Sequence, residues 1–360
     1  MANQLDAYRG CLLGLAVGDA MGMPVDDMTW DQIQENYGPH GLLGYDLRSD
    51  YAEITSYTQV AAFICNALLL SVSRGKGDKV LDFVKLAQRE WTRSQQFARD
   101  PEGSYCWVAK LPAFRRRLCR DARMLDTLRL AAMGFPERGL NKYNAPGSLT
   151  SAVAVGMFYN PQRLTPPQIG ELSAQIVSLT HGDPTAFLSA AVLSYAITGI
   201  LMEPQLPLET QFRSAISAME GLFRSKYPEA SQVAATLKAA VRRAKAAEPM
   251  GQVMEEMQCY SAMNCLAGAM YASLANQNDF DTAMITAVNH SGYSSAVGAI
   301  TGAVLGAKMG YSALPDFYVE SLEPVKALCQ LADDMLSGTP AKGLFDDDWD
   351  HKYVQGLPLI

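Results

Sequence analysis

The chain has 360 residues, of which 49% are hydrophobic and 19% are charged, enough to build one large apolar core. Its formal net charge of -7 argues against duplex nucleic acid or an anionic membrane surface as a partner, because neither gains from approaching like charge. This acidic balance still allows a small nucleotide in a local pocket.

Helical periodicity runs through almost the whole chain. Runs of alternating polar and apolar residues rich in Val, Ile or Thr are nearly absent, so the sequence predicts an all-α fold. Apolar residues recur at spacings of three and four in segments 5–17, 60–72, 80–91, 169–179, 186–202, 212–223, 230–247, 254–274 and 320–335.

Residues typical of helix ends flank several of these segments. Thr29, Thr165 and Asp183 are expected to cap helix starts, and the last two each precede a proline. Gly310 and Gly338 are expected to end helices. No linker rich in Pro, Gly and Ser divides the chain, so we expect a single domain over residues 1–360. The acidic segment that follows Leu344 is expected to dock by its aromatic side chains.

Cysteine usage and the apolar runs indicate the compartment. The seven cysteines are odd in number and form no CxxC pair, so we expect free thiols in a reducing environment. The first residues lack a basic region followed by an apolar one, so no signal peptide is predicted. The longest apolar stretch, 187–202, is interrupted by Ser, Tyr and Thr and is too short and polar to cross a bilayer. We therefore expect a cytoplasmic protein without a membrane partner.

Glycine recurs at every fourth position in two stretches. Residues four apart stack on one helix face, and each glycine there costs about 1 kcal/mol relative to alanine. Close approach by another helix or by a ligand is the expected compensation. We infer that these two helices lie centrally and cross closely, with their ends near one site, although packing without a site is the alternative. The glycines are Gly10, Gly14, Gly18, Gly22, Gly298, Gly302, Gly306 and Gly310.

Four segments, in the right order along the chain, resemble motifs of the ADP-ribosylglycohydrolase family. Residues 10–26 are similar to the family's opening GxxxGxAxGDAxGxPxE. Residues 53–59 stand where the family has T-D-D-T before a long helix, and residues 179–184 resemble its T-H-x-x-P. Residues 288–302 resemble an altered GGDxDTVGAIxGAxxGA. The resemblance implies an orthogonal helical bundle.

The resemblance also implies cleavage of the bond between ADP-ribose and a protein side chain or small acceptor, typically with two divalent ions. Such ions need carboxylate ligands, which the family takes from its second and fourth segments. Here Ser56 and Tyr57 replace the first Asp pair, and Tyr293 and Ser295 replace the second. Neutral hydroxyl groups cannot neutralise two divalent cations. We therefore expect no metal ion and no other cofactor.

The residues that frame the family's site are still present. Asp19 and Asp26 match acidic positions of the first segment and are the candidate catalytic residues. Gly147 and Ser148 correspond to the family's phosphate-contacting loop, and their backbone N–H groups could bind a phosphate. The candidate ligand-binding residues are Thr55, Ser56, Tyr57, Thr58, Gly147, Ser148, Tyr293, Ser294 and Ser295.

Several of these residues have purely structural alternatives. Asp19 could hydrogen-bond a helix end, Asp26 could belong to a solvated turn, and Ser148 could be an ordinary helix cap. His181 is interpreted as a packing residue. The basic cluster is interpreted as a solvated surface or a patch for an acidic partner, and not as a nucleic-acid site. That cluster comprises Arg115, Arg116, Arg117, Arg120 and Arg123.

Three functions follow as hypotheses. We favour binding of an ADP-ribose-, nucleotide- or sugar-like small molecule without metal-dependent cleavage. The second is a metal-independent glycohydrolase of an ADP-ribosyl or ribosyl bond that uses Asp19 or Asp26 as general acid or base. The third is a structural or regulatory pseudoenzyme whose tyrosines fill the former metal cavity. The sequence does not determine the oligomeric state.

Overall fold

The computed structural model describes residues 3–47, 49–96, 103–130, 133–159, 163–246, 248–340 and 346–354. Within these ranges the chain forms 17 α-helices joined by turns and short 3₁₀ segments, without a β-strand, so the all-α prediction is confirmed. The helices are α1 (Gln4–Gly22), α2 (Trp30–Tyr37), α3 (Ser56–Ser73), α4 (Val80–Gln96), α5 (Ala122–Arg129), α6 (Ser151–Phe158), α7 (Pro166–Ser178), α8 (Pro184–Met202), α9 (Leu208–Phe223), α10 (Glu229–Arg243), α11 (Met250–Met257), α12 (Ala262–Ala275), α13 (Phe280–Val288), α14 (Ser294–Met309), α15 (Asp316–Glu320), α16 (Val325–Ser337) and α17 (Asp347–Tyr353).

Helix ends lie where the capping residues predict them. Thr29 and Thr165 each form a capping box with the glutamine three residues later, and Asp183 accepts a hydrogen bond from the first turn of α8. Helices α14 and α16 end at Gly310 and Gly338, whose φ angles of 91° and 66° favour glycine. Local capping chemistry therefore fixes these boundaries.

Two of the periodic segments are interrupted, and there the sequence prediction is wrong. Segment 254–274 divides into α11 and α12, because Gln258 adopts a left-handed conformation with φ of 49° and Ser261 caps α12. In segment 320–335, Pro324 precedes the first turn of α16, so the helix begins only at Val325. The apolar spacing continues across both breaks because one apolar residue in each connection, Cys259 or Leu322, is itself buried.

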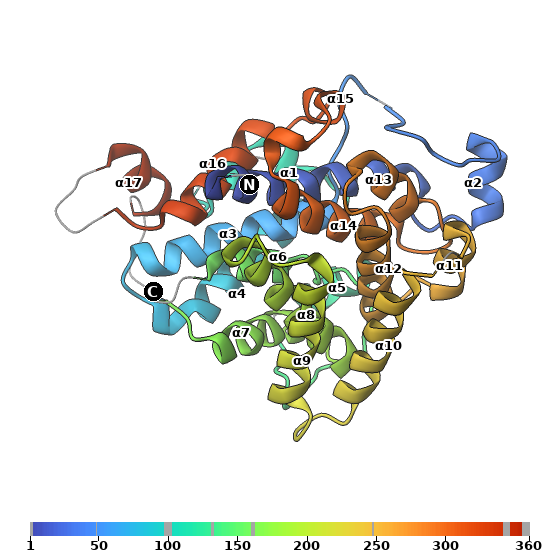
Figure 1. Ribbon diagram of the computed structural model, residues 1–360. Coiled ribbons are helices and arrows are strands. Elements are labelled where there is room, and N and C mark those ends of the chain that lie inside the picture. Colours follow the sequence, from blue (N-terminus) through green and yellow to red (C-terminus); the bar gives the residue numbers. More distant parts are fainter. Residues whose placement is uncertain are drawn as a thin grey trace.

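The two glycine-rich helices, α1 and α14, pack antiparallel against each other (Figure 1). Gly14 faces Gly302 and Gly18 faces Gly298, and a Cβ added to any of these glycines would come within 3.0 Å of the facing backbone. The inferred close crossing is therefore confirmed. Gly22 continues the contact to the first turn of α14, which brings the end of α1 to the start of α14.

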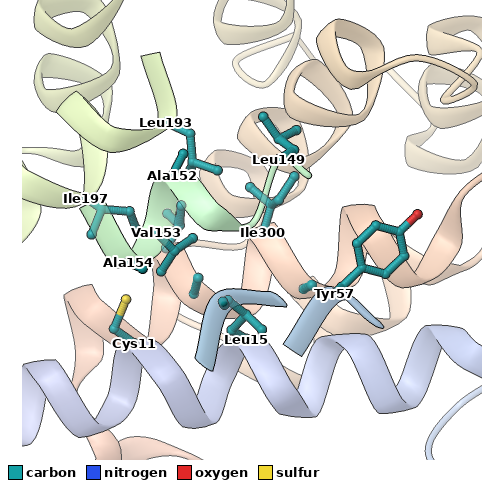
Figure 2. Close-up of a cluster of buried hydrophobic side chains, with 14 of the residues drawn as sticks. Cys11, Leu15, Tyr57, Leu149, Ala152, Val153, Ala154, Leu193, Ile197 and Ile300 are labelled. Carbon is teal, nitrogen blue, oxygen red and sulfur yellow. The ribbon is translucent and has the colours of Figure 1, made fainter. Parts of the chain in front are cut away.

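Other helices surround this pair. Helices α3 and α8 are long and apolar enough to cross a membrane, yet 89% and 83% of their apolar windows are buried inside the structure, as in core helices of a folded domain. Side chains of α1, α3, α6, α8 and α14 meet in one apolar cluster (Figure 2). Leu15, Tyr57, Val153, Leu193 and Ile300 each contribute from a different helix.

The acidic C-terminal segment docks through its aromatic residues, as predicted. Trp349 and Tyr353 of α17 are buried, and the Tyr353 hydroxyl donates to Asp334 at 2.7 Å. Phe345, which belongs to the same predicted segment, lies outside the described residues. All seven cysteines are free, and Cys119 and Cys329 are the two that are not fully buried.

Candidate functional site

Asp19 fixes the start of α3. Its carboxylate is fully buried and accepts four hydrogen bonds, from the backbone N–H and the hydroxyl of both Thr55 and Thr58, at 2.6–3.0 Å. Burial raises the pKa of Asp19, and these hydrogen bonds oppose the rise. Four donors use the acceptor capacity of a carboxylate. Asp19 therefore makes the helix-end contact that was the structural alternative to catalysis.

Asp26 lies between the end of α1 and the start of α14. Gly22 allows this position, because a Cβ there would lie 2.5 Å from the backbone nitrogen of Ser295. Asp26 Oδ1 accepts a hydrogen bond from that same N–H at 2.8 Å. The Asp26 side chain is wholly buried, so the solvated-turn alternative is wrong for this residue, whereas Asp27 is exposed.

Arg120 faces the second oxygen of Asp26. Its Nε lies 3.5 Å from Asp26 Oδ2, and neither atom has a hydrogen-bond partner among the described residues. Nη2 donates to the carbonyl of Met23 at 2.6 Å, and the Arg120 backbone N–H donates to Ser56 Oγ at 3.0 Å. Arg120 is thus held by its guanidinium at one end and by its backbone at the other. It is partly solvated, with 28% of its side chain exposed, and its contacts with Met23 and Asp26 were not predicted.

The electrostatics of Asp26 follow from this burial. Removal from water raises the pKa of Asp26 to about 7, although the Arg120 charge and the Ser295 N–H favour the ionised form.

The predicted basic cluster does not form one surface. Whereas Arg120 faces Asp26, Arg116 contacts Glu53 and Glu323.

Tyr57 lies on the first turn of α3 and is 1% exposed. The Thr150 hydroxyl donates to its carbonyl at 2.7 Å, which ties α3 to the residues before α6. Burial raises the pKa of Tyr57 well above its ordinary value, and the nearby charges of Asp26 and Asp121 raise it further. Figure 2 shows its hydroxyl directed away from the apolar cluster. The ring therefore separates the core from the polar region.

The loop before α6 adjoins a buried aspartate–histidine pair. A Cβ on Gly147 would collide with the carboxylate of Asp121, so this contact requires glycine. Asp121 caps α5 and bonds His181 Nε2 at 2.8 Å, while His181 Nδ1 bonds the hydroxyl of Thr180 at 2.8 Å. Burial alone would raise the pKa of Asp121, but His181 and backbone N–H groups outweigh it and lower the pKa. His181 is thus the buried packing residue that was predicted.

Two tyrosine rings form the rim of this region. Tyr293 is partly buried and meets the ring of Tyr260 at 6.4 Å in an edge-to-face arrangement, and Tyr260 is 51% exposed. The Tyr293 N–H donates to the carbonyl of Cys259, and Ala262 N–H donates to that of Asn144. Sequence reasoning missed Tyr260 because it assigned the residue to the interior of a helix.

All the predicted site residues therefore lie near the starts of α3, α6 and α14. Among the parts of the chain that the structure describes, no group of three or more His, Cys, Asp or Glu side chains is arranged to hold a metal ion. Buried polar atoms without a protein partner cost free energy unless water or a ligand supplies one. Four such atoms belong to residues of this region: Asp26 Oδ2, Arg120 Nε, Ser148 Oγ and Ser295 Oγ.

Comparison with known proteins extends over nearly the entire chain. The model of the ADP-ribosylglycohydrolase family matches residues 1–344. An uncharacterized protein of Archaeoglobus fulgidus is 25% identical over 349 residues, which cover 91% of this chain and 95% of that protein. A solved structure described as an ADP-ribosylglycohydrolase-related protein complex gives a TM-score of 0.61 at 22% identity, over 93% of this chain and 98% of its own. At that identity the likeness supports the fold alone.

Proposed function

Because the chain belongs to the ADP-ribosylglycohydrolase family, we propose that it binds an ADP-ribose-, nucleotide- or sugar-like molecule at the region between Tyr57 and Tyr293, without metal-dependent cleavage. The observation that carries this proposal is the buried ring of Tyr57, which the family motif aligns with a metal-ligating aspartate. We also propose that the protein acts in the cytoplasm, in keeping with its free cysteines.

The donor set does not fit a pair of divalent ions. Hard cations require clustered carboxylate oxygens. Both oxygens of Asp19 already accept from two threonines, and Asp26 faces a guanidinium. The four positions that the motifs align with metal-binding aspartates hold two serines and two tyrosines. This chemistry supports a site that works without metal.

The remaining groups suit a nucleotide or a sugar. Tyr293 and Tyr260 offer aromatic faces and edges against which a base or a sugar ring can pack. We propose that the hydroxyl groups of Ser148 and Ser295, which have no hydrogen bond to any described residue, bond hydroxyl groups of the ligand. A purely structural role also accounts for the buried Tyr57, but it leaves those polar atoms unexplained.

A second candidate is a metal-independent glycohydrolase, and one observation favours it. Burial raises the pKa of Asp26 to about 7, the range in which a carboxyl group can donate and accept protons at neutral pH. Asp26 would protonate the leaving group of a glycosidic bond. Asp19 is less suited to this task because its oxygens already accept four hydrogen bonds.

Calorimetry with ADP-ribose, in magnesium and in excess chelator, tests the proposal. We expect equal affinity in both buffers, and we expect Tyr293→Ala to weaken binding by about tenfold, since stacking contributes roughly 1–3 kcal/mol per ring. Tyr51→Ala is the matched control, because Tyr51 is 51% exposed and its contact with Ser49 is made by its backbone N–H, which alanine keeps.

The outcomes separate the candidate functions. Binding that requires magnesium would contradict the proposal. Release of ribose or ADP-ribose in chelator from an ADP-ribosylated substrate, lost in Asp26→Asn, would favour the hydrolase. Absence of binding by ADP-ribose, nucleotides and sugars alike would favour a structural role.

A further inference from the structure

We propose that the cleft between residues 111–114 and the start of α16 binds a small apolar carboxylic acid. The cleft has a volume of about 590 Å³, which lies within the range of small-molecule sites in proteins. None of the predicted site residues lines this cleft, so it is a second site, and the inference does not depend on the proposed function.

The first argument is the apolar character of the walls. Nine of the twelve residues that line the cleft are apolar, and they come from two segments that are far apart in the chain. Leu111 and Phe114 belong to one segment, and Leu322 and Val325 belong to the other. Phe114 and Leu322 are buried, whereas Leu111 and Val325 are partly exposed. The apolar body of a ligand gains free energy by covering such a surface.

The second argument is that the fold fixes both walls. On one wall, the carbonyl of Ala113 accepts a hydrogen bond from the buried side chain of Gln59 in α3, at 3.1 Å. Arg116, which follows this wall in the chain, pairs with Glu323 of the opposite wall at 2.5 Å. The two walls are thus joined to each other and to the core. The cleft therefore belongs to the folded chain and needs no ligand in order to form.

The third argument comes from the positive groups at one end of the cleft. Lys326 lines the cleft, is exposed, and forms no ion pair with any described residue. It stands in the first turn of α16, which no side chain caps. The N–H groups of residues 325–327 have no acceptor outside the helix among the described residues. Such a helix start attracts a carboxylate, and here a lysine and apolar walls adjoin it.

Two carboxylates of the cleft weaken this attraction but do not reverse it. The charge of Glu323 is balanced by Arg116. Glu320 is exposed, so water screens its charge. One screened carboxylate therefore stands against Lys326 and the start of α16. The cleft thus favours an acid over an amine of the same shape.

Calorimetry on the full-length chain with three naphthalene probes tests the inference. The probes are 1-naphthoate, 1-naphthylmethanol and 1-naphthylmethylamine, which share an apolar body and differ in charge. We expect 1-naphthoate to bind about threefold tighter than the alcohol, and the amine to bind weakest. Lys326→Met should weaken 1-naphthoate binding by about threefold, because it removes one exposed charge contact. Lys226→Met is the control, because Lys226 is an exposed lysine that lines a different cavity.

Val325→Asp tests the walls. It replaces an apolar wall residue by a carboxylate, so we expect 1-naphthoate to bind at least about tenfold more weakly. Val325 is the first residue of α16, where an aspartate favours the helix, so we expect the variant to fold. If it does not fold, Lys326→Met keeps the test decisive, because Lys326 is exposed.

Three outcomes would overturn the inference. The first is a wild type that binds none of the probes. The second is unchanged affinity for 1-naphthoate in both Val325→Asp and Lys326→Met, since the probe would then bind elsewhere. The third is tighter binding of the amine than of the acid, because the cleft would then select a cation.

Discussion

The seam between α1 and α14 and the polar region at its end are built by the same two helices but satisfy opposite requirements. Along the seam, the facing positions of both helices are glycines, so the two backbones are in direct contact. At its end, Asp26 and Arg120 form a loose ion pair at 3.5 Å, and the buried Ser295 hydroxyl has no hydrogen bond to any described residue. Close packing stabilises a fold, whereas buried polar atoms without hydrogen bonds destabilise it. The seam therefore serves stability, and the contrast supports our proposal that the polar region binds a ligand.

The largest expected effect is at the seam. Gly302→Val would drive a branched side chain into the backbone of Gly14, and we expect a loss of more than about 4 kcal/mol of unfolding free energy or no folding at all. Urea denaturation measures this loss. The matched control is Gly221→Ala on the exposed side of α9, where nothing lies within 4 Å of the added Cβ. There we expect a gain of about 0.5–1 kcal/mol. Normal stability of Gly302→Val would disprove the tight seam.

The next effect is the pH dependence that Asp26 gives to stability. Its pKa is raised to about 7, against about 4 in an unfolded chain, so the folded state holds the proton more tightly. The stability that this proton contributes is complete below pH about 4 and is lost as the pH rises through about 7. The difference between the folded and unfolded pKa of Asp26 corresponds to at most about 4 kcal/mol of unfolding free energy.

Melting temperatures of the wild type and Asp26→Asn between pH 4 and 8 measure this effect. We expect the wild type to lose stability relative to the variant across that range, because asparagine carries no charge at any pH. Asp27→Asn removes the exposed carboxylate of the next residue, and we expect a much smaller change of melting temperature with pH relative to the wild type. A constant difference between wild type and Asp26→Asn would mean that Asp26 is solvated like its neighbour.

Much of the fold can be predicted from sequence because its determinants are local. Threonine caps such as Thr29 and Thr165 bond residues three positions away, and the spacing of the glycines fixes a helix face. The break at Gln258 is not predicted, because a left-handed backbone is usually signalled by glycine and here the residue is glutamine. The apolar period also continues on both sides of it. Local rules therefore predict the helices better than their interruptions.

The candidate site is less predictable, because its partners come from distant segments. Family motifs identify Asp26 and Ser295, yet only the folded chain brings Arg120 to them, 94 positions after Asp26. Arg120 stands in a run of arginines whose composition indicates solvent exposure, and Tyr260 stands in an apparent helix. Arg120 and Tyr260 owe their places to contacts between distant segments, which sequence patterns do not predict.

The smallest expected effect compares two neighbouring serines at the start of α6. The Ser148 hydroxyl is buried without a partner among the described residues, whereas the Ser151 hydroxyl donates to the Ser148 carbonyl at 2.6 Å. Ser151→Ala should therefore lose about 1 kcal/mol, the usual net contribution of a hydrogen bond. Ser148→Ala should change stability by less than about 0.5 kcal/mol, since it removes an unpaired group. Thermal denaturation of both variants resolves the difference. A larger loss in Ser148→Ala than in Ser151→Ala would mean that the Ser148 hydroxyl is already bonded, through ordered water, in the free protein.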